Sequence, residues 1–277
     1  MQGRIIKAIS GFFYVECNGN TYECKAKGIF RKKEETPVVG DIVEFDEINE
    51  KEGNVISIGE RKNILVRPPI SNIDIVIIVA AIKIPAISTL FIDKQLAYLR
   101  NKGIDCIICI NKSDLGEAND IVDIYRNIGY DVVLTSAKDD TGVDVLKEKI
   151  VGKTAVFVGN SGVGKSSLTN KLLKTKVMEE GDLSKIERGK QTTRHTELLK
   201  ISDNTYIADS PGFSSFELGE IDDIASLFVE FNEYIGECKY RDCRHIKEDD
   251  CAIKKALAEG KISKSRYDNF CLLANKQ

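Results

Sequence analysis

Gly159-Asn-Ser-Gly-Val-Gly-Lys-Ser-Ser167 is the stretch that decides the fold. It matches a pattern of one glycine, four arbitrary residues and then Gly-Lys-Ser, and it lies between an apolar strand-like run and a helical pattern. In that context the glycines let backbone N–H groups curl around phosphates at a helix N-terminus. We therefore predict a phosphate-binding loop in which Lys165 reaches the β and γ phosphates and Ser166 ligates Mg²⁺. The expected nucleotide contacts are Gly159, Asn160, Ser161, Gly162, Val163, Gly164, Lys165, Ser166 and Ser167.

A second motif, Asn111-Lys112-Ser113-Asp114, follows the apolar strand predicted at residues 105–110. A carboxylate at Asp114 can accept hydrogen bonds from guanine N1–H and the exocyclic amine. Adenine offers neither donor there, so the site would discriminate strongly against it. Ser136 and Ala137, in a Ser-Ala-Lys sequence after another strand, can contact guanine O6 through the backbone. Together with the phosphate loop, Asn111, Lys112 and Asp114 indicate a guanine-nucleotide site.

The third group of residues concerns the γ-phosphate and its metal ion. Asp209-Ser-Pro-Gly212 ends a short predicted strand, so Asp209 can hold Mg²⁺ through water and the Gly212 amide can contact the γ-phosphate. Thr192 and Thr193 lie between the phosphate loop and this motif, and we assign the last Mg²⁺ ligand to Thr193. These elements are the five motifs of GTPases, but the two guanine motifs come first in the chain. A circular permutation explains that order.

The chain on either side of these motifs predicts three domains. Residues 1–67 contain five short strands, at 4–10, 12–17, 22–26, 41–46 and 54–58, which predict an OB-type β-barrel. Residues 68–218 alternate strands and helices, as in a doubly wound α/β sheet, and carry the permuted P-loop GTPase motifs. Residues 219–277 are predicted to be mainly helical and to bind zinc. The fold class is therefore multidomain α/β.

Two local expectations apply to the ends of the barrel domain. Its aromatic residues either stack on RNA bases or fill the barrel, and the candidates are Phe12, Phe13, Tyr14 and Tyr22. Arg67-Pro68-Pro69 predicts an extended linker.

The C-terminal domain contains a cluster of potential metal ligands, Cys238, Cys243, His245 and Cys251. Three thiolates and one imidazole match a closed structural zinc site, although the spacing is not that of a common zinc finger. Helices are predicted at residues 223–234, 254–259 and 263–275. The other five cysteines are interpreted as packing residues.

Composition narrows the class of protein. Of 277 residues, 42% are apolar and 30% charged, with a net charge of −3, which is typical of a globular domain protein and not of a general nucleic-acid coat. No apolar run approaches the ~20 residues of a membrane span. We expect a cytoplasmic monomer without membrane contact.

These motifs together resemble the ribosome small-subunit-dependent GTPase A family (RsgA, also called YjeQ), and the resemblance extends over nearly the whole chain. It rests on the Asn111–Asp114, Gly159–Ser167 and Asp209–Phe213 motifs, on Gly189-Lys-Gln-Thr-Thr193, and on the cysteine–histidine cluster. It implies GTP hydrolysis stimulated by the 30S subunit and assistance in late 30S maturation. It also implies that the barrel and the zinc domain contact 16S rRNA, with GTP/GDP, Mg²⁺ and one Zn²⁺ as cofactors.

The sequence departs from the expected hydrolytic machinery at two positions. Phe213 occupies the place where many GTPases have the glutamine that orients water. The family usually has a histidine directly before the two threonines, whereas this chain has Gln191. We predict that Gln191 positions the water, with Lys165 and Thr193 completing the catalytic set; His195 is a second candidate.

Two other classes of function remain open from the sequence. One is an RNA-binding or scaffolding protein that uses GTP only as a ligand, which multiple turnover would exclude. The other is a P-loop ATPase or small-molecule kinase, which Asp114 disfavours and which an ATP preference would support.

Overall fold

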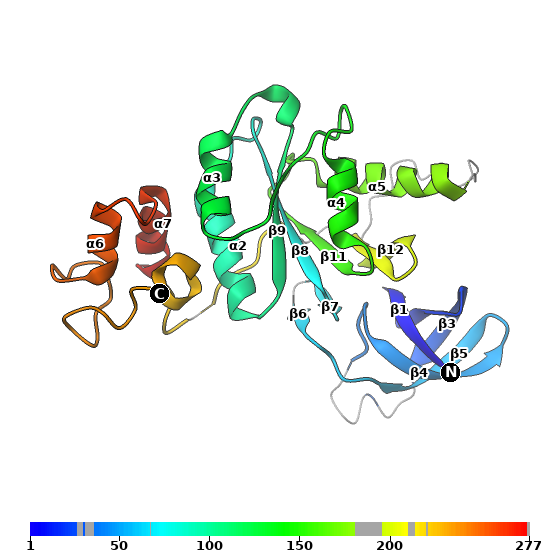
Figure 1. Ribbon diagram of the computed structural model, residues 1–277. Helices are drawn as coiled ribbons and strands as arrows, with labels where there is room; N and C mark the ends of the chain where they lie inside the picture. The colour runs from blue at the N-terminus through cyan, green and yellow to red at the C-terminus, as the bar shows by residue number, and fades with distance from the viewer. Residues whose placement is uncertain are drawn as a thin grey trace. The chain divides into compact units, whose positions relative to one another are not determined.

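The computed structural model describes residues 1–26, 30, 36–66, 68–180, 196–209, 214–219 and 221–275, and for residues 174–180 and 209 it describes the backbone alone. The chain divides into two compact units, and Figure 1 labels its helices and strands. Unit 1 consists of Met1–Val76, Val143–Val158 and Lys165–Ser214, and unit 2 of Ile77–Gly142, Gly159–Gly164 and Ser215–Gln277. The three domain boundaries inferred from the sequence stay a prediction. Among the described residues, no helix combines the length and apolar character that crossing a bilayer requires.

Unit 1 contains the predicted five-stranded barrel. Its strands are β1 (Gln2–Ile9), β2 (Phe12–Cys17), β3 (Asn20–Ala26), β4 (Ile42–Asn49) and β5 (Glu52–Ile58). They pair in the order β1-β2-β3-β5-β4, and β4 pairs back to β1, which closes the sheet. Alternating apolar side chains fill the barrel, because successive strand residues point to opposite faces; Ile5, Val15 and Phe45 are fully buried. The OB-type barrel is confirmed.

A short hairpin follows the barrel, where the sequence predicted an extended linker. Strands β6 (Ile64–Val66) and β7 (Pro69–Ser71) pair antiparallel. Leu65 and Ile70 lie opposite each other in that register and are both fully buried. The linker prediction was wrong because burial of these two side chains stabilises a paired conformation that the Pro-Pro sequence alone does not indicate.

The rest of unit 1 carries part of the α/β sheet. Strand β11 (Thr154–Val158) runs parallel to β13 (Thr205–Asp209), and β12 (Glu197–Ser202) pairs antiparallel with β13. Two helices described in this part of the unit are α4 (Val143–Ile150) and α5 (Lys165–Glu180). β12 also pairs antiparallel with β1, so the sheet continues directly into the barrel.

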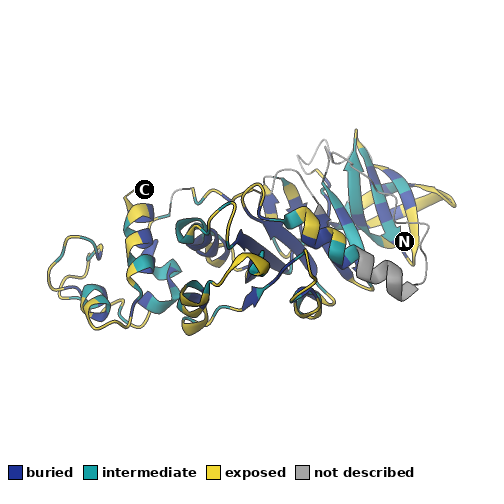
Figure 2. Cartoon of the chain, turned by 90° about the horizontal axis from the view of Figure 1, so that it is seen from above, coloured by how far each residue is buried: buried dark blue, intermediate teal, exposed yellow. Residues whose placement is uncertain are grey.

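Unit 2 continues the predicted alternation of strands and helices. Strands β8 (Ile75–Ala81, whose first two residues belong to unit 1), β9 (Asp105–Asn111) and β10 (Val132–Leu134) are neighbours, and β9 and β10 are parallel. Every residue of β8 is buried, as expected for a parallel strand covered on both faces. Figure 2 colours the chain by burial and shows dark blue, buried strands at its centre. The helices are α2 (Thr89–Asn101), α3 (Asn119–Asn127) and the single turn η1 (Ser113–Leu115).

The C-terminal part of unit 2 is mainly helical. It comprises two 3₁₀ turns, η3 (Ala225–Leu227) and η4 (Val229–Phe231), followed by α6 (Ala252–Ala258) and α7 (Lys264–Ala274). The helix predicted at residues 223–234 was wrong. Phe228 has an extended backbone, with φ −91° and ψ 104°, which interrupts the helical path between the two turns. The interruption places the Phe228 ring 5.2 Å from that of Phe231 and 5.6 Å from that of Phe270.

A buried ionic network joins this part to α2. Arg266 on α7 is 1% exposed and donates to Asp93 Oδ1 on α2 at 2.7 Å. Its Nε and Nη2 donate to both carboxylate oxygens of Glu230 at 2.7 and 2.9 Å. Asn269 Nδ2 and the Tyr125 hydroxyl complete the partners of Asp93, at 2.7 and 2.8 Å. This C-terminal part is therefore attached to α2 and α3, the helices on either side of the Asn111–Asp114 segment in the chain.

Candidate functional site

The phosphate loop connects β11 to α5, as the sequence predicted. Gly164 has a φ of +100°, and a Cβ atom on it would lie 2.2 Å from Asn111 Nδ2. A Cβ on Gly159 would lie 2.3 Å from the Val79 carbonyl oxygen. Both positions therefore require glycine for a steric reason, and at Gly164 the backbone conformation requires it as well. Lys165 is the first residue of α5, and desolvation lowers its pKa from the ordinary value.

The exposure of the loop suits a ligand site. Asn160, Ser161 and Gly162 are exposed, as are Ser166 and Ser167 on the first turn of α5. Val163 is the exception, with 3% exposure, and its carbonyl accepts a hydrogen bond from Asn111. Helix N-termini favour anions because their first N–H groups lack intrahelical partners. The first turn of α5 thus presents an exposed helix N-terminus of the kind that phosphate groups bind.

Asn111 is the residue that joins three motifs. Its Nδ2 donates to the Val163 carbonyl in the phosphate loop at 2.8 Å. Its Oδ1 accepts from the Thr135 hydroxyl at 3.2 Å and from the Ala137 amide at 3.3 Å. The side chain is 1% exposed, so each bond is shielded from water. The structure thereby brings together segments that lie between 24 and 52 residues apart in the chain.

Asp114 is held in position by the Ser-Ala-Lys segment. The Ser136 hydroxyl donates to Asp114 Oδ1 at 2.9 Å, and Lys138 Nζ lies 3.7 Å from Oδ2. The Asp114 side chain remains 15% exposed, so its carboxylate stays accessible from one side. Lys112 adopts a left-handed conformation (φ 63°) and donates to the Ile84 carbonyl. These contacts orient the carboxylate that the sequence assigned to reading the base.

The γ-phosphate residues are only partly described. Asp209 is the last residue of β13, where the sequence analysis placed it, and its backbone lies opposite Glu197. Gln191, Thr192, Thr193, His195, Gly212 and Phe213 lie outside the described residues. Their assigned roles therefore stay predictions.

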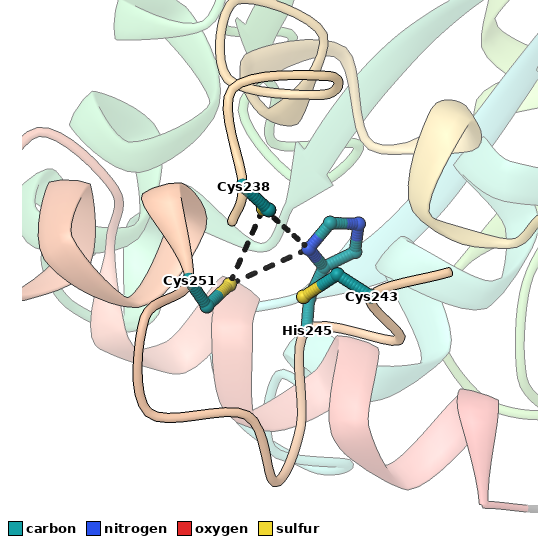
Figure 3. Close-up of side chains that lie close together, drawn as sticks. All are labelled: Cys238, Cys243, His245 and Cys251. Carbon is teal, nitrogen blue, oxygen red and sulfur yellow. Dashed lines mark hydrogen bonds between the residues drawn. The ribbon is translucent and has the colours of Figure 1, made fainter. Parts of the chain in front are cut away.

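The predicted metal ligands gather in one place. His245 Nδ1 lies 3.5 Å from Cys238 Sγ and 3.4 Å from Cys251 Sγ, and those two sulfurs are 3.9 Å apart (Figure 3). All four donor atoms, including Cys243 Sγ, lie within 4.8 Å of one another. Tetrahedral zinc with bonds of about 2.3 Å to sulfur requires ligand separations of roughly 3.5–4 Å. The geometry and the donor types fit a zinc ion.

Glu248 stabilises the loop between two of these ligands. Its carboxylate accepts backbone N–H bonds from Arg244 at 3.2 Å and from Ile246 and Lys247 at 3.1 Å. Hydrogen bonds from backbone amides, its own first and then those three, lower the pKa of Glu248 to about 2. Tyr267 on α7 donates its hydroxyl to the His245 carbonyl at 2.8 Å. The loop therefore has the outer hydrogen bonds that orient metal ligands.

Sequence reasoning missed Thr135 and Gln95. Thr135 lies directly before Ser136, and a hydroxyl at a strand end beside a recognised motif was an available signal for its bond to Asn111. Gln95 is fully buried on α2, accepts from the Phe216 amide at 2.7 Å and donates to the Phe216 carbonyl at 3.4 Å. It anchors the chain shortly after Gly212, and no local pattern indicates that.

The fold and the site define a class: a guanine-nucleotide GTPase with circularly permuted motifs, an N-terminal OB-type barrel and a C-terminal Cys₃His cluster. Family models agree, since residues 58–219 match the RsgA GTPase model and residues 2–55 the RsgA N-terminal domain model. The chain belongs to the RsgA GTPase family.

Individual relatives and solved structures are similar over almost their full length. "Small ribosomal subunit biogenesis GTPase RsgA" of Clostridium botulinum (strain Eklund 17B / Type B) is 45% identical, over 98% of this chain and 95% of the relative. The protein of that name from Geobacillus kaustophilus (strain HTA426) is 44% identical, over 97% and 94%. The crystal structure of YloQ, a circularly permuted GTPase, superposes with a TM-score of 0.79 at 39% identity, covering 99% of this chain and 94% of that one. YjeQ from Thermotoga maritima gives 0.80 at 33% identity, covering 99% and 97%.

Proposed function

We propose that this GTPase acts in biogenesis of the small ribosomal subunit, binds that subunit and hydrolyses GTP faster when bound to it. The names of relatives 44–45% identical support the subunit as partner. The observation that carries the nucleotide part is the set of hydrogen bonds from Asn111 to Val163, Thr135 and Ala137. These bonds assemble a guanine site from motifs in permuted order. Late 30S maturation in the cytoplasm, by a monomer without membrane contact, completes the proposal.

The roles of the nucleotide-site residues follow from their chemistry. Asp114, held by Ser136, reads guanine, because only guanine presents two donors to one carboxylate. Lys165 neutralises phosphate charge, and desolvation of its ammonium group lowers its pKa. Ser166, Thr193 and Asp209 would hold Mg²⁺, which would offset the charge of the phosphates. Gln191 orients the attacking water, since an amide both donates to and accepts from water.

The barrel supports a contact with 16S rRNA through its outer face. Phe13 and Tyr22 are buried in the barrel, at 7% and 5% exposure, and are therefore core residues. Phe12 and Tyr14 are only half-buried, and Lys25 Nζ lies 5.2 Å from the centre of the Phe12 ring. A partly exposed aromatic ring beside a cation suits stacking on an unpaired base next to a phosphate.

The Cys₃His cluster binds one structural zinc ion in this proposal. Its four protein donors leave no open position for a substrate, so the ion stabilises residues 238–251 without taking part in hydrolysis. The functional domains are then the barrel at 1–67, the GTPase domain at 68–218 and the zinc-binding domain at 219–277.

Steady-state GTP hydrolysis with and without purified small subunits tests the proposal. The variants are Asp114→Ala and Gln191→Ala, with Asp123→Ala as a matched carboxylate control because Asp123 is exposed on α3. We expect subunits to stimulate the wild type and the Asp123→Ala control. Asp114→Ala should lose GTP affinity, whereas Gln191→Ala should retain affinity and lose turnover. An unstimulated wild type would refute the link to the small subunit.

A further inference from the structure

Three strands in unit 1 connect the barrel to the motif that begins at Asp209. Lys7 on β1 lies opposite Glu197 on β12, and Glu197 lies opposite Asp209 on β13. Lys7 Nζ is 3.2 Å from Glu197 Oε2, and the two side chains are 33% and 15% exposed. One row of cross-strand neighbours, Lys7, Glu197 and Asp209, therefore connects the barrel to the start of the nucleotide motif.

The hairpin formed by β12 and β13 has its open end at this row. β12 starts shortly after Thr192 and Thr193, and β13 ends at Asp209. The two chain segments assigned to the γ-phosphate therefore join the hairpin at its open end. β1 pairs with the hairpin at the same end, through Glu197. If nucleotide binding shifts this end of the hairpin, the distance between Lys7 and Glu197 changes before the contacts farther along the hairpin do.

A second set of contacts fastens the barrel to the hairpin farther from Asp209. Glu16 on β2 accepts from Lys200 Nζ at 2.5 Å and from the Tyr206 hydroxyl at 3.1 Å. The Arg4 guanidinium lies 5.1 Å from the centre of the Tyr206 ring. Lys200 and Tyr206 are themselves cross-strand partners on β12 and β13. These contacts hold the hairpin to the barrel away from Asp209, whereas the Lys7–Glu197 pair lies in the row that contains Asp209.

We propose that Lys7 and Glu197 are positioning residues that couple RNA binding at the barrel to nucleotide binding at the Asp209 strand end. The proposal rests on the function above, because it takes the barrel to bind subunit RNA and Asp209 to serve the nucleotide site. Coupling between two sites is reciprocal, so GTP strengthens subunit binding by the factor by which the subunit strengthens GTP binding. Opposite charges across neighbouring strands hold that register, and removing either one weakens it.

The first test measures affinity for purified small subunits in the presence of GDP or a non-hydrolysable GTP analogue. We expect the wild type to bind about tenfold more tightly with the analogue, a typical coupling factor. Lys7→Gln and Glu197→Gln should reduce that ratio to near one, and the exchanged pair Lys7→Glu with Glu197→Lys should restore it. Glu16→Gln, which removes the negative charge from the second set of contacts, is the matched control and should keep the ratio.

The second test uses hydrogen exchange on the protein alone, so it does not depend on the subunit. In the wild type, the amides of β1 should be better protected with the GTP analogue than with GDP. Glu197→Gln should abolish the difference, and Glu16→Gln should retain it.

Each outcome decides the inference separately from the proposed function. Three results would overturn the coupling and leave subunit binding intact. The wild type could bind subunits equally well with both nucleotides, the single variants could keep the wild-type affinity ratio, or Glu16→Gln could lose that ratio to the same extent as they do. If the wild type does not bind subunits, the proposed function fails, and hydrogen exchange alone decides whether nucleotide and barrel are coupled. Equal protection of β1 with both nucleotides would then overturn it.

Discussion

At the scale of single residues, the nucleotide site depends on one close approach between backbone and side chain. Asn111 can donate to the Val163 carbonyl only because Gly164 has no Cβ, which would otherwise lie 2.2 Å from Nδ2. The glycine of the phosphate loop thus serves two motifs. It permits the loop conformation, and it admits the asparagine that ties the loop to the base-reading segment.

Gly164→Ala should therefore abolish tight GTP binding and lower stability by about 1–3 kcal/mol, since a strained backbone and a clash occur together. The matched control is Gly129→Ala. Gly129 has a similar φ of +89°, but a Cβ there would meet no atom within 4 Å. Nucleotide titration and thermal unfolding measure the two effects. Equal GTP affinity in both alanine variants would contradict the steric argument.

Glu248 offers a second test at the residue scale. Replacing it by glutamine removes the negative charge of the group that accepts backbone N–H bonds from Arg244, Ile246 and Lys247, on both sides of His245. We expect Glu248→Gln to lose zinc to a chelator about tenfold more readily, as when other outer hydrogen-bond partners of metal sites are changed. The neighbouring exposed carboxylate Asp249 gives the control, Asp249→Asn. Identical rates of zinc loss in both variants would show that the loop does not need Glu248.

At the scale of elements, α2 is the helix on which several parts of unit 2 meet. Gln95 holds the backbone of Phe216, and the Tyr98 and Phe216 rings stack with centroids 4.7 Å apart. On the same helix, Asp93 accepts a hydrogen bond from Arg266 on α7. The chain that leaves the Asp209–Gly212 motif is thus anchored on the helix that also holds the zinc-binding part.

Arg266→Met should destabilise the protein by about 3–5 kcal/mol, because it leaves Asp93 and Glu230 as buried charges without their partner. Lys264→Met, on the same helix, removes an exposed i,i+4 pair with Asp268 and should change stability by less than about 0.5 kcal/mol. Denaturant unfolding compares them. A small loss in Arg266→Met would mean that Asp93 takes up a proton at little cost, consistent with desolvation raising its pKa.

At the scale of the whole molecule, the nucleotide motifs and the zinc cluster rely on different stabilising contacts. Residues 238–251 contain no helix or strand and are held mainly by the four ligands and Glu248. The buried cluster around Phe228, Phe231 and Phe270 includes Cys251, and Cys238 and Cys243 pack against it. The Arg266 network with Asp93 and Glu230 includes none of the four ligand residues.

Removing the metal with a chelator should therefore increase hydrogen exchange in residues 238–251 while GTP affinity changes by no more than about twofold, as for independent sites. Small-subunit affinity should fall, because the proposed RNA-contacting loop loses its shape. Re-addition of Zn²⁺ should restore both protection and subunit affinity. Loss of GTP binding in the metal-free protein would show that the zinc-binding part supports the nucleotide site directly.

The sequence by itself determined the features that depend on neighbours in the chain. The phosphate loop, the guanine motif and the ligand cluster were all recognisable because their chemistry requires certain residue types at short, regular spacings. The barrel strands and the alternating strands and helices followed from periodicity and turn residues, which are also local. The roles of Gln191, Thr193 and Gly212 stay predictions from the sequence.

Tertiary structure decided what depends on residues distant in the chain. A helix was expected at residues 223–234. The folded chain instead forms two separate turns there, and these allow Phe228 to pack against Phe231 and Phe270. The hairpin of β6 and β7, the partners of Arg266 and the junction of Lys7 with Glu197 likewise have no local signature. Their stability comes from burial and charge pairing between segments that only the folded chain brings together, and Lys7 and Glu197 meet only because β1 and β12 become neighbouring strands.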